Sequence, residues 1–127
     1  MRNDPEAIYY AFAGKLVGTK SMKGLVCDAV ALLPDELIEK VTKNCWFISS
    51  MEDAWAFTFK GNDLKDQDLI FLSDSLLAQD AHQISYSIIH EIGHVVLNHR
   101  NSTTVKQTKE EIRRQELEAD NFARLYV

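Results

Sequence analysis

The chain has 127 residues, of which 46% are hydrophobic and 26% are charged, and its formal net charge is −5. These values are ordinary for a globular protein, and the length suits a single domain over residues 1–127 with one core. The negative charge disfavours direct binding to nucleic acid or to an anionic membrane, and no stretch approaches the roughly 18 apolar residues that a membrane span requires.

Helices are predicted over the first third of the chain. Asp4 followed by Pro5 is typical of a helix N-cap and first turn. Apolar residues at helical spacing then extend this predicted helix over residues 5–17. A second, more buried helix is predicted over residues 25–33, and a short third helix over residues 35–43.

Strands are predicted in the middle of the chain, where short runs of aromatic and β-branched residues replace the helical pattern. The runs cover residues 45–48, 54–59 and 68–72. A turn signal at residues 61–63 makes the last two strands antiparallel neighbours. The predicted fold class is therefore α+β, with a small, three-stranded sheet.

Two helices are predicted after a loop at residues 73–80. The first is a long amphipathic helix over residues 81–97, and the second runs from residue 106 to the C-terminus. The apolar contacts expected from the last helix are Ile112, Leu117, Phe122 and Leu125.

The two cysteines, Cys27 and Cys45, are isolated in the sequence and have no metal-binding spacing. We interpret them as reduced, partly buried thiols rather than as a disulfide.

Residues 1–18 lack the pattern of a secretory signal peptide. The expected location is therefore the cytoplasm.

The sequence His-Glu-Ile-Gly-His at residues 90–94 is the motif that carries chemistry. On a helix, His90 and His94 share a face with Cβ atoms about 5–6 Å apart, so that both can bind one Zn²⁺. Glu91 lies beside them and is suited to act as a general base towards water. The alternative is two ordinary histidines on a buried face. A glycine within a helix costs roughly 1 kcal/mol relative to alanine. Close packing against another element would explain why Gly93 is there despite this cost.

A catalytic zinc site needs a third protein ligand and an open position for water. The candidates are His82, His99, Glu116 and Glu118. His82 precedes His90 by about two helical turns and lies too far along the axis. His99 is one residue out of register with the metzincin pattern, in which the third histidine follows the second by six residues.

Glu116 is the favoured third ligand, because it shares a helix face with Asp120 through i,i+4 spacing. Asp120 could then accept a hydrogen bond from the second ring nitrogen of a ligand histidine and fix its orientation. Glu118 points away from that face and is expected to be solvated. A charged helix surface is the alternative interpretation of these carboxylates.

Residues 90–99 together with residues 116–123 resemble the ImmA/IrrE-type zinc metallopeptidases, a minimal gluzincin-like group. The resemblance covers about residues 68–127. It implies a zincin-like single domain with an HExxH active-site helix and a C-terminal glutamate helix. It also implies Zn²⁺ at His90, His94 and Glu116, with Glu91 catalytic. Members of the group are linked to regulated cleavage of DNA-binding repressors.

We therefore predict a zinc-dependent endopeptidase that acts on a protein or peptide substrate, a transcriptional repressor being the substrate that the resemblance implies. An additional donor for the oxyanion is expected, and His99, Tyr86 and Tyr126 remain open for it. A substrate strand is expected to add to an exposed sheet edge at residues 69–72. The alternatives are a non-catalytic regulatory module that binds zinc and a toxin-like component of a mobile genetic element. The presence of Glu91 favours an enzyme over these alternatives, because a structural zinc site needs no general base beside its ligands.

Overall fold

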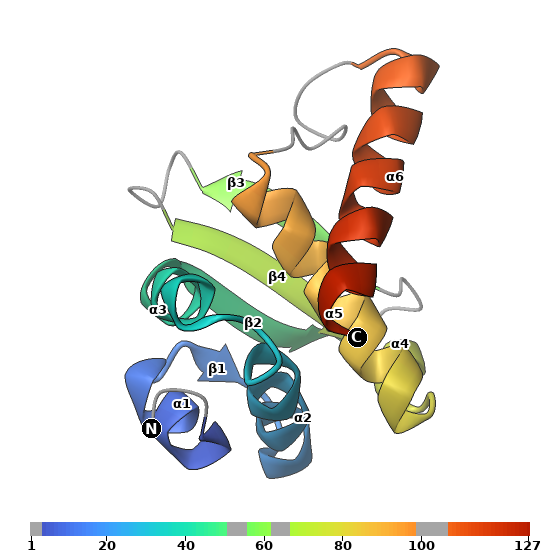
Figure 1. The fold of residues 1–127 in the computed structure, drawn as a ribbon. Coiled ribbons are helices and arrows are strands. Elements are labelled where there is room, and N and C mark those ends of the chain that lie inside the picture. Colours follow the sequence, from blue (N-terminus) through green and yellow to red (C-terminus); the bar gives the residue numbers. More distant parts are fainter. Residues whose placement is uncertain (1–3, 51–55, 62–66, 99–106) are drawn as a thin grey trace.

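The computed structural model describes residues 4–50, 56–61, 67–98 and 107–127. Figure 1 shows the elements, which in chain order are α1 (Pro5–Ala11), β1 (Leu16–Val17), α2 (Lys20–Val30), α3 (Asp35–Asn44), β2 (Cys45–Ser50), β3 (Ala56–Gly61), β4 (Gln67–Ser73), α4 (Asp74–Leu77), α5 (Ala81–Val96) and α6 (Lys109–Tyr126). The fold is α+β, as predicted. None of the helices in these residues is long and apolar enough to cross a lipid bilayer.

The sheet has four strands in the order β1-β2-β4-β3, one more than predicted. Strands β1 and β2 pair in parallel, as do β2 and β4. Strands β3 and β4 are antiparallel, which confirms the predicted arrangement of these two neighbours. The predicted sheet edge at residues 69–72 is wrong, because β4 pairs with a strand on each side. The edges of the described sheet are β1 and β3.

The predicted first helix over residues 5–17 is too long, since α1 ends at Ala11. The backbone of Ala13 and Gly14 is in the left-handed region, with φ values of 52° and 87°, and this interrupts the helix. Leu16 then pairs with Phe47 of β2. Leu16 is buried, as the apolar stripe requires, but it is buried in a strand.

One face of the sheet is built from alternate residues of β2 and β4. Phe47 is opposite Ile70 in register, and both are fully buried. Phe12, next to the end of α1, packs edge to face on Phe47, with ring centroids 5.7 Å apart. This contact anchors the N-terminal segment on the sheet.

Both cysteines are free and buried, as the sequence predicts. Burial, with a smaller contribution from Asp28, raises the pKa of Cys27 to about 11. Burial, reinforced by the charge of Asp68, raises the pKa of Cys45 to about 12. At neutral pH these thiols are protonated side chains of the core and poor nucleophiles.

The two C-terminal helices carry the sequence motifs. Helix α5 agrees with the predicted helix to within one residue, and Asp80 caps its N-terminus by accepting a hydrogen bond from the backbone N–H of Gln83. Helix α6 begins after Thr108, whose hydroxyl oxygen accepts a hydrogen bond from the backbone N–H of Glu111. Helix α6 lies beside α5 (Figure 1).

The buried face of α6 differs from the predicted one. Phe122 is buried as predicted, but the prediction was wrong for Ile112, Leu117 and Leu125, which are exposed. The buried positions of α6 are Gln115, Ala119, Phe122 and Ala123. The spacing of these four residues is helical, so α6 contacts α5 through a face with small side chains at two positions.

Gly93 of α5 lies against Phe122 of α6. A Cβ atom at this position would lie 3.0 Å from Cδ1 and 3.2 Å from Cγ of Phe122. Gly93 is thus the point of close helix packing that its position within a helix led us to expect. The absence of a side chain lets the ring of Phe122 rest against the backbone of α5.

Replacement of Gly93 by alanine is expected to destabilise the fold. Overpacking costs about 1–3 kcal/mol and the gain in helix propensity is about 1 kcal/mol, so we expect a net loss of about 1 kcal/mol. The free energy of unfolding in urea measures this loss. Gly24→Ala on α2 is the matched control, because a Cβ there meets nothing within 4 Å and should stabilise the fold. Equal stabilisation by both substitutions would contradict the packing argument.

Candidate metal-binding site

Two histidines one turn apart on α5 form the centre of the site. The Nε2 atoms of His90 and His94 are 3.2 Å apart, and their ring centroids are 4.8 Å apart. The side chains are 15% and 16% exposed. The rings therefore lie at the edge of the core with their Nε2 atoms turned towards one another.

Glu116 reaches this pair from α6. Its Oε2 lies 3.0 Å from Nε2 of His90, and its Oε1 lies 3.3 Å from Nε2 of His94. The Glu116 side chain is 55% exposed, so the cluster is open to solvent on this side. The packing of α5 against α6 thus joins three residues that are up to 26 positions apart in the sequence.

The donor atoms of this cluster suit a metal ion. Ligand atoms 2.0–2.1 Å from Zn²⁺ in tetrahedral geometry lie about 3.3 Å from one another. The two Nε2 atoms here are 3.2 Å apart, and the two oxygens of Glu116, Oε2 and Oε1, lie 3.0 and 3.3 Å from the Nε2 atoms of His90 and His94, respectively. With one donor atom taken from each residue, all three atoms lie within 4.8 Å of one another. If neither Nε2 atom carried a proton, their lone pairs would repel one another at 3.2 Å, so a proton or a cation is needed between them. The cluster of His90, His94 and Glu116 could therefore hold a metal ion.

Electrostatics also favour a cation here. Burial lowers the pKa of His90, but the hydrogen bond to Glu116 and the charges of Glu91, Glu116 and Asp120 outweigh it and raise the pKa above its usual value. The hydrogen bonds to His90 and His94 hold the pKa of the Glu116 carboxyl well below its usual range. Glu116 is therefore ionised at neutral pH, and the site has a negative potential.

Asp120 lies behind His90, on the side away from the cluster. Its Oδ1 is 2.8 Å from Nδ1 of His90. Nδ1 of His90 is buried, and it lies close to this oxygen without forming a regular hydrogen bond. The hydroxyl of Tyr86 donates to the same Oδ1 at 2.8 Å.

Glu91 follows His90 on α5 and is half-buried. Its negative charge acts on His90 and raises the pKa of that imidazole. Glu91 is close enough to influence the cluster but is not one of the three residues whose donor atoms converge. Its predicted role as a general base stays a prediction.

The other candidates from the sequence lie elsewhere. His82 is exposed in the first turn of α5, and His99 lies outside the described residues. Glu118 is exposed, and its Oε1 lies 3.8 Å from Nε of Arg114. The ring of Tyr126 packs on Phe122, with centroids 5.2 Å apart. The hydroxyl hydrogen of Tyr86 is engaged by Asp120, so Tyr86 is poorly suited to the oxyanion role.

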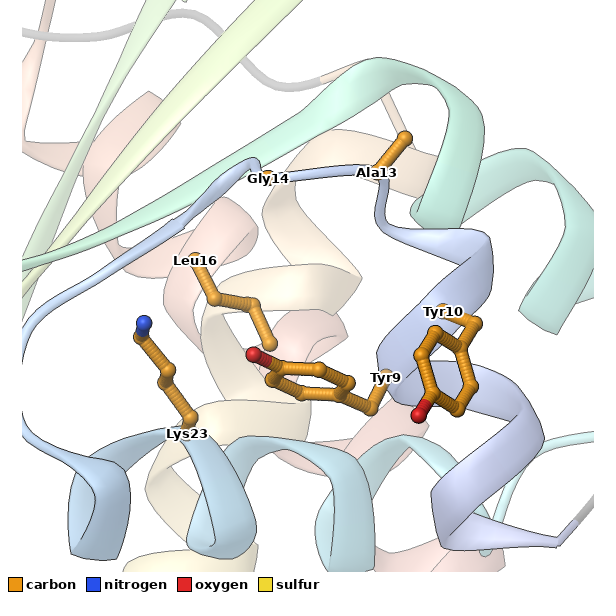
Figure 2. Close-up of a pocket in the computed structure, with 6 residues that line it drawn as sticks. All are labelled: Tyr9, Tyr10, Ala13, Gly14, Leu16 and Lys23. Carbon is orange, nitrogen blue, oxygen red and sulfur yellow. The ribbon is translucent and has the colours of Figure 1, made fainter.

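A small hollow lies in the N-terminal part of the fold. Figure 2 shows the six residues that line it, which are Tyr9, Tyr10, Ala13, Gly14, Leu16 and Lys23. They belong to α1, β1, the segment between them and α2, and none belongs to α5 or α6. The hollow is therefore separate from the histidine cluster, which lies at an exposed surface and not in this pocket.

An α+β fold in which two helices bring two imidazoles and a carboxylate together defines a protein with a candidate metal site. The family model described as Peptidase U49 matches residues 77–127. No curated protein and no solved structure matches the chain. The matched segment contains α5 and α6, and thus the cluster, Glu91 and Asp120. The match supports a peptidase function, whereas the narrower resemblance to the ImmA/IrrE group stays a prediction.

Proposed function

We propose that this chain is a zinc-dependent endopeptidase of the zincin-like, gluzincin type. The observation that carries the proposal is the convergence of His90 and His94 with Glu116 from the neighbouring helix. In this proposal the three residues hold Zn²⁺, and Asp120 orients His90. Two histidines, one carboxylate and an open side are the composition of a catalytic rather than a structural zinc site.

The proposed reaction is hydrolysis of a peptide bond. When bound, Zn²⁺ supplies a Lewis acid that polarises the scissile carbonyl and acidifies water. The Glu91 carboxylate takes a proton from the attacking water as the water oxygen forms its bond to the carbonyl carbon. Glu91 then passes this proton to the leaving nitrogen as the C–N bond breaks. One peptide bond and one water thus become a carboxylic acid and an amine.

The edge strand β3 is our candidate for the place where substrate binds. Strand β3 has β4 on one side only in the described sheet, and it contacts α5. An extended peptide could add to this edge through backbone hydrogen bonds, which give affinity with little sequence discrimination. Such a peptide would run close to the helix that carries His90 and His94.

A DNA-binding repressor is the proposed physiological substrate, following the resemblance to the ImmA/IrrE group. We place the reaction in the cytoplasm, because two buried free thiols are typical of a reducing compartment. The protein substrate would supply the DNA-binding module, consistent with the net negative charge of this chain.

Metal removal tests the proposal. Purified protein is expected to contain about one zinc per chain and to cleave unfolded casein or a purified helix-turn-helix repressor. A strong chelator should abolish cleavage, and added zinc should restore it. Free zinc at about 1,000 times its dissociation constant should also stabilise the fold by about 4 kcal/mol, which thermal unfolding measures.

The outcomes separate the proposal from its alternatives. Protein that holds no zinc and gains no stability from it would exclude a zinc peptidase. Protein that holds zinc at His90 and His94 but cleaves neither substrate would favour a non-catalytic regulatory module. Cleavage that appears only with an added partner would favour the toxin-like component of a mobile element.

A further inference from the structure

Tyr86 belongs to a chain of polar contacts that leads to the metal cluster. It lies one helical turn before His90 on α5. Its hydroxyl donates to Oδ1 of Asp120 at 2.8 Å, and the same oxygen lies 2.8 Å from Nδ1 of His90. The rings of Tyr86 and His90 are 6.3 Å apart between centroids and tilted by 33°. One carboxylate oxygen therefore bridges a phenol and an imidazole of the same helix.

Asp120 needs a second partner to hold this position. Its side chain is 35% exposed, so water competes for the carboxylate, and its contact with Nδ1 of His90 is not a regular hydrogen bond. The hydroxyl of Tyr86 supplies that partner from within α5, where the ring is half-buried. Because Tyr86 and His90 are on one rigid element, the bond fixes Oδ1 relative to the imidazole.

The protonation state of Tyr86 is consistent with this role. Burial, the hydrogen bond to Asp120 and the charge of Asp120 raise the pKa of the phenol, and the charge of Arg124 together with its hydrogen bond to Tyr86 only partly opposes them. The phenol therefore remains a donor at neutral pH. A carboxylate oxygen that receives this hydrogen bond keeps lone pairs for a second donor, the Nδ1–H of His90.

We propose that Tyr86 is a positioning residue of the metal site, which holds Asp120 so that Asp120 keeps Nε2 of His90 facing Glu116. The proposal rests on the proposed zinc site. It assigns to Tyr86 a role in metal affinity that operates through Asp120. It also gives the hydroxyl of Tyr86 a physical role.

Zinc affinity measured by chelator competition tests the proposal. Tyr86→Phe is expected to weaken zinc binding by about threefold to tenfold, less than the loss of about 10–100-fold expected for a direct partner such as Asp120. The decisive comparison is a double-mutant cycle with Asp120→Ala. In that background Tyr86→Phe should have no further effect, because the group through which it acts is gone.

A second readout does not depend on activity. In the zinc-loaded protein, the Nδ1 proton of His90 should give a slowly exchanging NMR signal, and Tyr86→Phe should broaden or shift it. Tyr126→Phe is the matched control, since it removes the same hydroxyl from a half-buried tyrosine of α6 whose ring packs on Phe122. It should change neither the affinity nor the signal.

Unchanged zinc affinity in Tyr86→Phe would overturn the proposal, as would an equal loss in the presence and absence of Asp120. These results leave the zinc peptidase itself intact, provided that wild-type protein holds zinc. A wild-type protein that binds no zinc overturns both proposals. Zinc binding without cleavage leaves the role of Tyr86 fully testable, because affinity and the NMR signal need no substrate.

Discussion

Glu91→Gln is expected to abolish most peptide cleavage while leaving the zinc content at about one per chain. The amide has the size of the carboxylate but cannot accept the proton of the attacking water. General-base catalysis contributes about 100- to 10,000-fold, so kcat should fall by at least about 100-fold. Because Glu91 is not among the three converging donors, metal binding should survive. Steady-state kinetics and elemental analysis on the same sample measure both quantities.

Glu118→Gln provides the control for this substitution. Glu118 is an exposed glutamate on α6 that lies 3.8 Å from Arg114, and it should tolerate the change without loss of rate. Cleavage by Glu91→Gln at the wild-type rate would remove Glu91 from the mechanism. Loss of zinc from Glu91→Gln would instead show that Glu91 is a ligand.

Helices α5 and α6 could be predicted from the sequence because their signals are local. The apolar period and the histidine pair of α5 follow from spacing alone, and the spacing between Glu116 and Asp120 places both on one face. Gly93 added the one indication of tertiary packing, and Phe122 is the side chain that explains it. That close approach lets a residue of α6 reach the α5 histidines.

The N-terminal segment shows why the spacing of apolar residues predicts which residues are buried better than it predicts secondary structure. The stripe through Ile8, Phe12 and Leu16 is indeed buried. The helix nevertheless ends before Leu16, because the left-handed backbone at Ala13 and Gly14 turns the chain into β1. The pairing of β1 with β2 is a long-range contact. A strand of two residues is also too short to show the alternation of apolar and polar residues that reveals a strand in a sequence.

The link from Tyr86 to Asp120 could not be predicted for a similar reason. It depends on the rotation of α6 about its own axis, which the apolar residues of α6 do not specify. Leu117 and Leu125 would suggest one face, yet the buried face is that of Ala119 and Phe122. Only the packed pair of helices shows that the hydroxyl of Tyr86 and the carboxylate of Asp120 meet.

Glu116→Ala is expected to remove zinc and, with it, all cleavage. The substitution takes away the only carboxylate among the three converging donors. It also leaves His90 and His94 without the negative charge that now lies 3.0 and 3.3 Å from their Nε2 atoms. Loss of a ligand should exceed the effect of losing an outer partner, so zinc affinity should fall by more than about 100-fold. Chelator competition measures the affinity directly.

Two neighbouring substitutions make this prediction specific. Glu118→Ala removes an exposed carboxylate two residues away on the same helix and should retain zinc, which separates coordination from net charge. His99→Ala should also largely retain zinc if Glu116 is the third ligand. The reverse pattern, with zinc kept by Glu116→Ala and lost by His99→Ala, would assign the third position to the histidine. That pattern would contradict the proposed gluzincin type, although it would leave the proposed role of Glu91 open to the same test.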